Sequence, residues 1–308
     1  MLRPLIYLLL TLAITGGAEE GTSRQWIWSG GQWRTYLLHV PPSASTTRPL
    51  PLVVVYHGFS GAAESMEAVT GFSPMADRER FVVAYPDALY HPEMGGNSWL
   101  TPAGDLADGN GAFIGDMVAA VRARVAIDRR RIFATGMSQG GGMSYFSVTG
   151  HPDVFAAIAP VVVSLPTGLD LAALLPGRPV PVMMINGTQD NLIPYLGGLG
   201  VNNVHFRPTP ALAAAWATHD QCFPYPMTWN LPNWNWFDGC TASVTQYFWG
   251  AQGSEVVLYT IHGGGHTWPA SRVWLPAFIF GNTCQDFDGT RAIWDFFVRH
   301  PLPAGVVN

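Results

Sequence analysis

The stretch that decides the fold is "RIFATGMSQGGGMSYF", residues 131–146. Its first half is an apolar strand pattern, and its second half changes to a helical pattern. The junction reads Gly136-x-Ser138-x-Gly140, which is the setting of a nucleophile elbow, a sharp turn that lifts a serine hydroxyl out of a sheet. Side chains at positions 136 and 140 would collide with the neighbouring strand and helix. The motif therefore predicts that Ser138 is a nucleophile, and the competing interpretation is a serine that only caps the helix.

Strand and helix patterns alternate on both sides of this junction. Continuous apolar runs predict strands that are buried on both faces, and apolar residues at helical spacing predict the helices between them. Such alternation is typical of an α/β fold, with a mostly parallel sheet covered by helices on both faces. The expected strands are 34–40, 51–58, 80–86, 131–136, 155–163, 180–187 and 255–261, and the expected helices are 112–125, 139–150, 209–219 and 289–300.

A serine nucleophile needs a base, and the base needs an acid that orients it. Asp190 closely follows the predicted strand 180–187, and His266 follows three glycines in the loop after strand 255–261. Both positions are carboxyl ends of strands, where active sites form in such sheets. His262 is the nearest rival of His266, but it abuts the strand and is expected to be held in the sheet edge. The carboxylates that compete with Asp190 are Asp170, Asp220, Asp238, Asp286 and Asp288.

Backbone N–H groups are expected to stabilise the oxyanion of the tetrahedral intermediate. One is the N–H of Gln139, directly after the nucleophile, and the other is the N–H of Phe59, after the strand 51–58. His57 precedes Ser138 in the chain and is expected to order this loop rather than to act as the base.

Composition limits the function classes. The chain has 308 residues, of which 48% are hydrophobic and 12% are charged, and its net charge is −5. This composition fits a globular protein with a substantial core, and the charge gives no reason to expect nucleic acid or an anionic membrane surface as a partner.

The N-terminus has the order of a secretory signal. Arg3 supplies a positive charge, residues 5–14 are apolar, and small residues lead to a cleavage site after Ala18. The competing interpretation is a buried N-terminal helix. We therefore expect a signal peptide at 1–18 and a single exported catalytic domain at 19–308, with no membrane association after cleavage.

The three cysteines are Cys222, Cys240 and Cys284. In an exported protein a pair is expected to be oxidised. Cys222 and Cys240 flank an aromatic segment and are the first expectation, while pairing with Cys284 stays open. Their scattered spacing does not resemble a zinc site, and no metal or cofactor is expected.

The segment 222–249, inserted before the histidine loop, is dense in aromatic residues. It suggests a lid or a platform for an aromatic acyl group, a sugar or a polyester, or alternatively a flap that packs on itself without touching a ligand. The candidate substrate-binding residues are Trp99, Trp234, Trp236 and Trp268.

These motifs together resemble a known family. The segments "PLVVVYHGFSG", "FVVAYPDA", "ATGMSQGGG", "MMINGTQDNLIPYLGG" and "GGGHTWP" are similar to secreted esterases of the polyhydroxybutyrate depolymerase and feruloyl esterase type, related to carbohydrate esterase family 1. The resemblance covers residues 34–300. It implies an α/β-hydrolase fold, the triad Ser138, Asp190 and His266, and an oxyanion hole built from the amides of Phe59 and Gln139.

The sequence departs from that pattern at three places. Phe59 stands where many relatives have a cysteine, Gly109-Asn110 replaces an aspartate pair, and Gln139 replaces a smaller residue. These changes leave the expected chemistry intact and leave the substrate open.

The predicted function is a secreted serine carboxylic-ester hydrolase that acts on a polyhydroxybutyrate-like polyester or oligoester. The alternative is a feruloyl or acetyl xylan esterase acting on plant polysaccharide. A serine peptidase and a non-catalytic binding protein of the same fold are the remaining hypotheses. The sequence leaves protein partners unknown.

Overall fold

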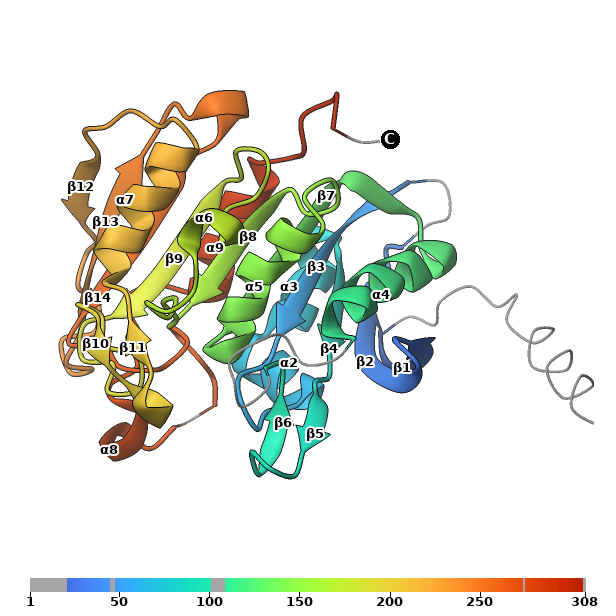
Figure 1. The fold of residues 1–308 in the computed structure, drawn as a ribbon, viewed down its shortest axis with the longest axis horizontal. Helices are drawn as coiled ribbons and strands as arrows, with labels where there is room; N and C mark the ends of the chain where they lie inside the picture. The colour runs from blue at the N-terminus through green and yellow to red at the C-terminus, as the bar shows by residue number, and fades with distance from the viewer. Residues whose placement is uncertain (1–20, 45–47, 101–108, 274, 307–308) are drawn as a thin grey trace, which may run out of the picture.

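The computed structural model describes residues 21–44, 48–100, 109–273 and 275–306. A ten-stranded sheet forms its centre, in the order β1-β2-β4-β3-β7-β8-β9-β14-β13-β12 (Figure 1). The six middle strands run parallel to one another, and antiparallel pairs extend the sheet at both edges. The middle strands are β4 (Val82–Pro86), β3 (Leu50–Tyr56), β7 (Ile127–Met137), β8 (Ala157–Val161), β9 (Val182–Gly187) and β14 (Val256–His262). The edge strands are β1 (Gly21–Ser29), β2 (Gln32–Val40), β13 (Thr241–Tyr247) and β12 (Met227–Asn230).

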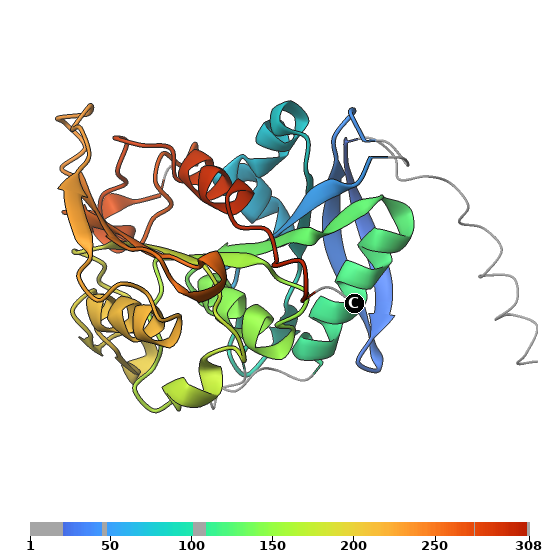
Figure 2. The same cartoon turned by 90° about the horizontal axis from the view of Figure 1, so that it is seen from above.

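Helices cover both faces of the sheet, as the alternating sequence pattern predicts (Figure 2). One face is covered by α4 (Asn110–Arg124), α5 (Gln139–Gly150) and α7 (Thr209–His219), which bury Phe113, Met143 and Trp216 against it. The other face is covered by α2 (Ala63–Thr70), α3 (Phe72–Glu79) and α9 (Gly289–Val298), which bury Phe72, Trp294 and Phe297. Each face therefore has its own hydrophobic core, and the predicted α/β fold class is confirmed.

Short elements gather where the parallel strands end, along the lower edge in Figure 1. The hairpin of β5 (Leu89–His91) and β6 (Gly96–Ser98) follows β4, and the pair β10 (Gly198–Leu199) and β11 (His205–Phe206) follows β9. Helix α8 (Ala277–Phe280) follows β14 at this edge. Helix α6 (Leu171–Leu174) follows β8 but lies against the C-terminal end of α5, where Thr149 Oγ1 donates to Leu174 O at 2.5 Å. Single 3₁₀ turns complete the described elements at Val201–Asn203 and Ala251–Gly253.

The sequence did not predict the elements at the periphery. Strand β1 alternates half-buried and exposed residues, and its exposed positions include Trp26 and Trp28, so it does not show the apolar run of a central strand. Helices α2 and α3 have only eight residues each and meet at Gly71, whose φ of 63° breaks the periodicity between them.

The aromatic segment 222–249 is not a single loop. Two of its stretches are the strands β12 and β13, which lengthen the sheet beyond β14. The expected pairing of Cys222 with Cys240 is wrong in this structure, because these residues flank opposite ends of β13. Cys222 packs near Gly250 at one end, and Cys240 immediately precedes Thr241 at the other. A seven-residue strand spans roughly 20 Å, far beyond the reach of a disulfide.

No helix among the described residues is both long enough and apolar enough to cross a membrane. The predicted signal peptide at 1–18 lies outside the described residues.

Candidate active site

Ser138 occupies the turn between β7 and α5 in a strained backbone conformation. Its φ of 58° and ψ of −124° lie in a region that residues other than glycine rarely adopt. Such strain costs roughly 1–3 kcal/mol and persists only where the surroundings enforce it. Here the N–H of Ser138 donates to Val161 O at 2.9 Å, and the N–H of Gly142 donates to Ser138 O at 3.1 Å. The strand and the helix together hold the serine in the conformation of a nucleophile elbow.

Two glycines make this turn possible. A Cβ atom on Gly140 would lie 2.2 Å from the carbonyl oxygen of Tyr56, and one on Gly136 would lie 2.5 Å from that of Gly140. Backbone atoms cannot move aside as a flexible side chain can. The expected collision with the adjacent strand and helix is therefore confirmed.

Gly140→Ala is expected to destabilise the fold by about 3 kcal/mol or more, because the added methyl group overlaps a strand carbonyl. Gly142→Ala is the matched control in the same helix, since a Cβ there meets nothing within 4 Å. It is expected to stabilise by about 0.5–1 kcal/mol through helix propensity. Urea unfolding measures both, and equal effects of the two substitutions would contradict the packing argument.

Asp190 and His266 form a buried, hydrogen-bonded pair at the carboxyl edge of the sheet. Their side chains are joined by a 2.7 Å bond between Oδ2 and Nδ1, and they are 5% and 3% exposed. The other carboxylate oxygen accepts the backbone N–H groups of Leu192 and Ile193 at 2.8 and 2.9 Å. With Nδ1–H donated to the carboxylate, Nε2 of the imidazole remains available to accept a proton.

Every rival carboxylate is engaged elsewhere. Asp170 and Asp288 cap the helices α6 and α9, and Asp220 lies buried among Val180, His219 and Ser254. Asp238 and Asp286 bind backbone N–H groups of the loops that carry Cys240 and Trp234. The rival histidine, His262, is exposed and bonds Ser243 on the neighbouring strand, as expected for a residue held at the sheet edge.

The glycines before His266 act through close packing. A Cβ on Gly265 would lie 2.0 Å from Phe280 O, and one on Gly187 would lie 2.3 Å from Gly264 O. The N–H of Gln189 donates to Gly264 O at 2.8 Å, and that of His266 donates to Phe280 O at 2.5 Å. The loop carrying the imidazole is therefore fixed to the loop carrying the carboxylate.

No hydrogen bond joins Ser138 Oγ to His266 within the described part of the chain. Such contacts are often long in enzymes without bound substrate and shorten in the reactive complex. The transfer of a proton from Ser138 to His266 therefore remains a prediction.

The loop after β3 lies directly against Ser138. A Cβ on Gly58 would be 3.3 Å from both Met137 O and Ser138 Cβ. Phe59, which follows, is 43% exposed. Neither its N–H nor that of Gln139 donates a hydrogen bond within the described residues, so both are available to an anionic oxygen, the role predicted for them.

A family model described as Esterase PHB depolymerase matches residues 34–192, more than half of the chain. The chain belongs to this family. The match includes the loop after β3, the turn at Ser138 and Asp190.

Sequence similarity to individual proteins extends beyond residues 34–192 of this chain. Feruloyl esterase B of Piromyces equi is 30% identical over 283 residues, which are 88% of this chain and 46% of that protein. The putative esterase NocK of Nocardia uniformis subsp. tsuyamanensis is 28% identical over 91% of this chain and 84% of its own length. Poly(3-hydroxyalkanoate) depolymerase C of Paucimonas lemoignei is 35% identical, over 40% of this chain and 30% of its own. The chain thus spans about half of the feruloyl esterase and less than a third of the depolymerase.

A solved structure shows the same fold. Acetyl xylan esterase from Aspergillus awamori superimposes with a TM-score of 0.61 at 18% sequence identity, covering 90% of this chain and 99% of that one. The α/β-hydrolase fold of this family member is therefore shown by structure as well as by sequence.

A buried polar network around Trp99 was not predicted from the sequence. The side-chain oxygen of Gln139 accepts the N–H of Trp99 at 2.9 Å, and its Nε2 donates to Ser98 Oγ at 2.9 Å. The Trp99 indole N–H donates to His57 O at 2.8 Å, next to the Gly58-Phe59 turn. One tryptophan therefore connects the two segments that supply the proposed oxyanion donors.

The same tryptophan is anchored in the core. Asn110 Nδ2 donates to Trp99 O at 2.8 Å, and Arg34 Nη2 donates to Asn110 Oδ1 at 2.7 Å. The Arg34 guanidinium stacks on Phe113 at 4.0 Å, and burial lowers its pKa to about 10. The departures from the family pattern at Gly109-Asn110 and at Gln139 were the sequence signals near this network, and neither one showed which residues it joins.

Two predicted substrate residues belong to the core instead. Trp99 is fully buried against Tyr56 and His57, and Trp268 is 1% exposed and donates its indole N–H to Thr290 Oγ1 at 3.0 Å. The prediction that Trp99 and Trp268 line a substrate pocket is therefore wrong in this structure. An aromatic residue near a catalytic motif does not reveal by itself which way it faces.

Gln139→Ala is expected to lower kcat by about 10- to 100-fold and to change KM by less than about threefold. Loss of the amide frees Trp99 and lets the oxyanion donors drift, which weakens transition-state contacts more than ground-state binding. Steady-state kinetics on a short-chain p-nitrophenyl ester measure both constants, and the melting temperature of the variant shows whether the fold is intact. An unchanged kcat would remove Gln139 from the positioning network.

Both ring nitrogens of His57 are hydrogen-bonded beside the loop after β3. Its Nδ1–H donates to Gly58 O at 2.7 Å, and its Nε2 accepts the N–H of Ala88 at 2.9 Å. Burial lowers the pKa of His57 below its usual range, although the bond to Gly58 and the charge of Asp87 oppose this. The arrangement fits the predicted role of His57 in ordering the loop.

The free energy of unfolding is expected to fall as pH drops below about 6.5, because the unfolded chain protonates His57 and the folded chain does not. The contribution approaches 1.4 kcal/mol per pH unit as an upper limit. Urea unfolding between pH 7 and pH 5 measures it. The pH slope should decrease in His57→Gln, and a slope equal to that of the wild type would contradict the assignment.

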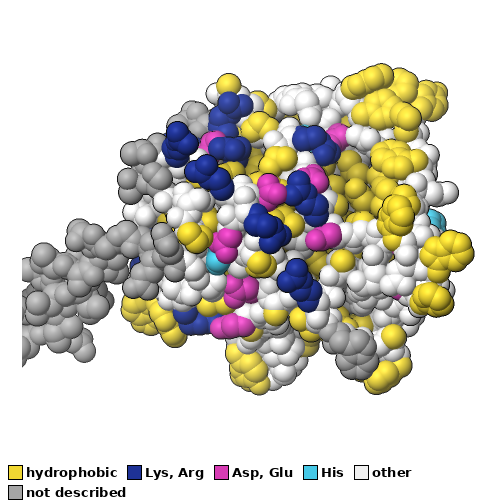
Figure 3. All heavy atoms as spheres, turned by 180° about the vertical axis from the view of Figure 1, so that it is seen from behind, with side chains coloured by type: hydrophobic (Ala, Val, Ile, Leu, Met, Phe, Trp, Pro, Cys, Tyr) yellow, Lys and Arg dark blue, Asp and Glu magenta, His cyan; other side chains and the backbone are white. Residues whose placement is uncertain are grey.

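The remaining two tryptophans lie at the active-site edge but in the open. The β13–β14 register places Thr241 opposite His262, so the connection between β12 and β13 lies at the carboxyl end of β14. Trp234 and Trp236 in this connection are 75% and 80% exposed. Exposed hydrophobic side chains gather along the edge formed by β12, on the right of Figure 3. Besides Trp234 and Trp236, the exposed large hydrophobic residues of the segment 222–249 are Phe223, Tyr225, Met227, Trp229, Phe237 and Trp249.

A cavity of about 510 Å³ opens beside Asp190. Polar side chains contribute much of its wall, including those of Thr188, Gln189, Asn191 and Asn282. Tyr195 and Leu196 also border it. The cavity therefore lies against the loop that carries the buried Asp190 carboxylate.

Proposed function

We propose that this chain is an exported serine carboxylic-ester hydrolase that works through an acyl-enzyme. The observation that carries the proposal is the buried Asp190–His266 pair at the same sheet edge as the strained Ser138 elbow. Membership in a family of esterases supports it. The sequence order of serine, acid and histidine is the order that this fold uses.

In the proposed reaction Ser138 Oγ attacks the ester carbonyl while His266 Nε2 accepts its proton. The amides of Phe59 and Gln139 bind the oxygen that becomes negative. His266 then protonates the leaving alcohol, and a water molecule that it activates releases the acid from Ser138. Asp190 keeps the imidazole oriented and stabilises its charged form. No metal or cofactor takes part in this scheme.

For the substrate we propose a polyhydroxybutyrate-like polyester or oligoester. Trp234, Trp236 and Phe237 expose apolar surface at the active-site edge, with Phe237 99% exposed. An aromatic surface in this position suits a chain of apolar ester units that extends beyond the catalytic centre. The similarity to a depolymerase of poly(3-hydroxyalkanoate) points the same way.

The second candidate is a feruloyl or acetyl xylan esterase. The polar wall of the cavity beside Asp190 favours it, because amide and hydroxyl groups there could bind sugar hydroxyls. The relatives named feruloyl esterase support this alternative.

A substrate panel on the purified chain tests the proposal. The panel contains p-nitrophenyl butyrate, a 3-hydroxybutyrate trimer, methyl ferulate, acetylated xylan and a chromogenic peptide, each with Ser138→Ala as the blank. We expect hydrolysis of the simple ester and a higher kcat/KM for the trimer than for methyl ferulate.

Other outcomes select other functions. Ferulate or acetate release without cleavage of the trimer would select the polysaccharide esterase, and cleavage of the peptide alone would select a peptidase. No turnover of any ester by the intact fold would leave a non-catalytic binding protein and would contradict the proposal.

A further inference from the structure

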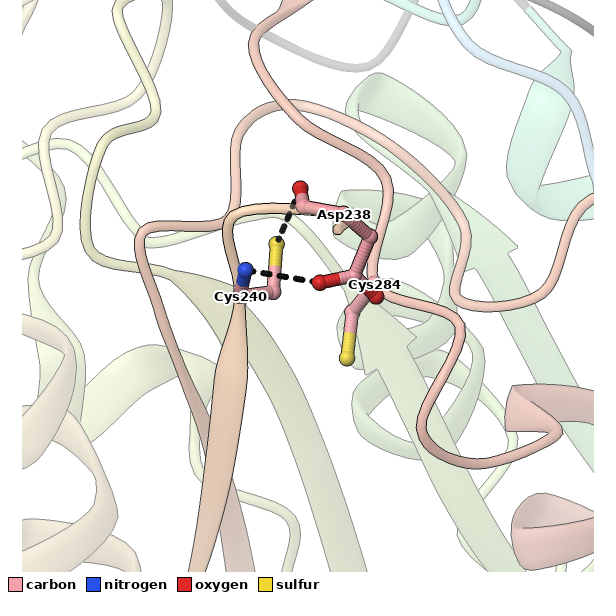
Figure 4. A group of neighbouring side chains, drawn as sticks. All are labelled: Asp238, Cys240 and Cys284. Atoms are coloured by element: carbon pink, nitrogen blue, oxygen red, sulfur yellow. Dashed lines mark hydrogen bonds between the residues drawn. The ribbon is translucent and has the colours of Figure 1, made fainter. Parts of the chain in front are cut away.

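Cys240 and Cys284 lie next to each other although 44 residues separate them in the chain. Their sulfur atoms and a carboxylate oxygen of Asp238 all lie within 4.8 Å of one another (Figure 4). The two cysteines are 5% and 1% exposed. The Cys240 thiol is turned toward Asp238 O at 3.7 Å, so a rotation about its Cα–Cβ bond is needed to bring the sulfur atoms together.

The two cysteines sit where two loops bind each other reciprocally. Asp238, in the loop before β13, accepts the N–H groups of Cys240 and Gln285 at 2.7 Å each. Asp286, in the loop before α9, accepts those of Trp234 and Asn235 at 2.7 and 2.9 Å. Each loop thus provides a carboxylate that accepts backbone N–H groups of the other loop. These bonds hold the two cysteines next to each other.

One of these loops also forms the wall behind His266. Phe280 O accepts the N–H of His266, and Asn282 O accepts the N–H of Gly265 at 2.9 Å and the hydroxyl of Thr267 at 3.0 Å. Cys284 O accepts the N–H of Ala270 at 2.8 Å. Cys284 therefore ends a segment that is bonded along its length to the loop carrying the imidazole.

We propose that Cys240 and Cys284 form a disulfide that joins the aromatic connection 231–240 to the wall behind His266, and that Cys222 remains a free thiol. The inference rests on the folded geometry and does not depend on the proposed function.

A metal site is the competing interpretation of this cluster, and the geometry does not favour it. Both carboxylate oxygens of Asp238 are already engaged by backbone N–H groups, and the group offers three ligands where structural zinc takes four.

In the proposed reaction, a low-molecular-weight disulfide such as glutathione disulfide oxidises the two thiols by disulfide exchange. The thiolate of one cysteine attacks the glutathione disulfide, forms a mixed disulfide and releases one glutathione. The other cysteine then loses its proton, attacks the mixed disulfide and releases the second glutathione. Two thiols are oxidised and one glutathione disulfide is reduced. Because the folded structure buries both cysteines, the exchange takes place before the two loops close.

Peptide mapping tests the pairing. The full chain is unfolded, reduced, refolded in a buffer of reduced and oxidised glutathione, and alkylated under denaturing conditions without reductant. Cys222 and Cys240 share one tryptic peptide, because no lysine or arginine lies between residues 208 and 271, so chymotrypsin is used. We expect the Cys240 and Cys284 peptides to be linked and Cys222 to be alkylated. Alkylation of all three cysteines, a link that contains Cys222, or one equivalent of zinc retained after dialysis against zinc would overturn the proposal.

Thermal unfolding provides a second readout. Dithiothreitol is expected to lower the melting temperature of the oxidised wild type by roughly 5–10 °C, since the bond closes a long loop. The double variant Cys240→Ser/Cys284→Ser should melt at the lower temperature with or without reductant, and Cys222→Ser should respond as the wild type does. A response of the wild type that persists in the double variant would also overturn the proposal, and the peptide map decides the pairing even if that variant fails to fold.

Discussion

Replacing Ser138 with alanine is expected to lower kcat for p-nitrophenyl butyrate by about 10⁴- to 10⁶-fold, with the fold retained. The substitution removes only the Oγ atom, and the strained turn is held by backbone hydrogen bonds that alanine can still make. Because these backbone hydrogen bonds persist, the melting temperature should stay close to that of the wild type.

The matched control is Ser144→Ala on the same helix. Ser144 is buried, and among the described residues its hydroxyl donates only to Gly140 O of the same helix, at 3.4 Å. Its activity should remain within about twofold of the wild type. Comparable losses in both variants would mean that the serine acts through helix stability, which is the helix-capping interpretation of the motif.

Asp190→Asn is expected to lower kcat by about 10⁴-fold. The amide can still accept the N–H groups of Leu192 and Ile193, but its NH₂ group faces His266 Nδ1 and favours the wrong tautomer of the imidazole. The charged imidazole that forms during proton transfer also loses its carboxylate partner. Steady-state kinetics with the same ester measure the loss.

Asp288→Asn serves as the control, because the Asp288 side chain caps helix α9 by accepting the N–H of Arg291 at 3.0 Å, its one hydrogen bond found within the described part of the chain. Its activity should stay within about twofold, with a small loss of stability of roughly 1 kcal/mol or less. A similar loss of activity in both variants would contradict the assignment of Asp190 as the acid.

The parts of the fold that the sequence predicts well are those that one local pattern controls. Helices 139–150 and 209–219 have the predicted bounds, because Ser138 with its strand and Pro210 in the first turn mark where they begin. The strands β3, β9 and β14 lie within one or two residues of the predicted ranges, since burial on both faces requires an uninterrupted apolar run. The turn at Ser138 was also predictable, because the backbone around it leaves no room for a side chain at Gly136 or Gly140 and the sequence therefore shows both glycines.

What the sequence could not predict depends on contacts between distant segments. Gln139 and Trp99 are 40 residues apart, and nothing near either residue indicates that one amide fixes the other. Trp99 and Trp268 face the core while Trp234 and Trp236 face solvent, although all four stand in comparable loop sequences. The partner of Cys240 is set by the course of β13, which separates Cys222 from it. Edge strands such as β12 were not predicted, because their residues are exposed on both faces and so show no alternation of apolar and polar residues.

Covalent trapping with a p-nitrophenyl alkylphosphonate tests the central claim most directly, because the reagent phosphonylates a serine only when a base and an oxyanion hole act on it. Mass spectrometry of the digested wild type should show one adduct, on Ser138, and its formation should abolish hydrolysis. The adduct should form at least about 10³-fold more slowly in His266→Ala. An inactivated enzyme with Ser138 unmodified, or an equal labelling rate in the two proteins, would contradict the account.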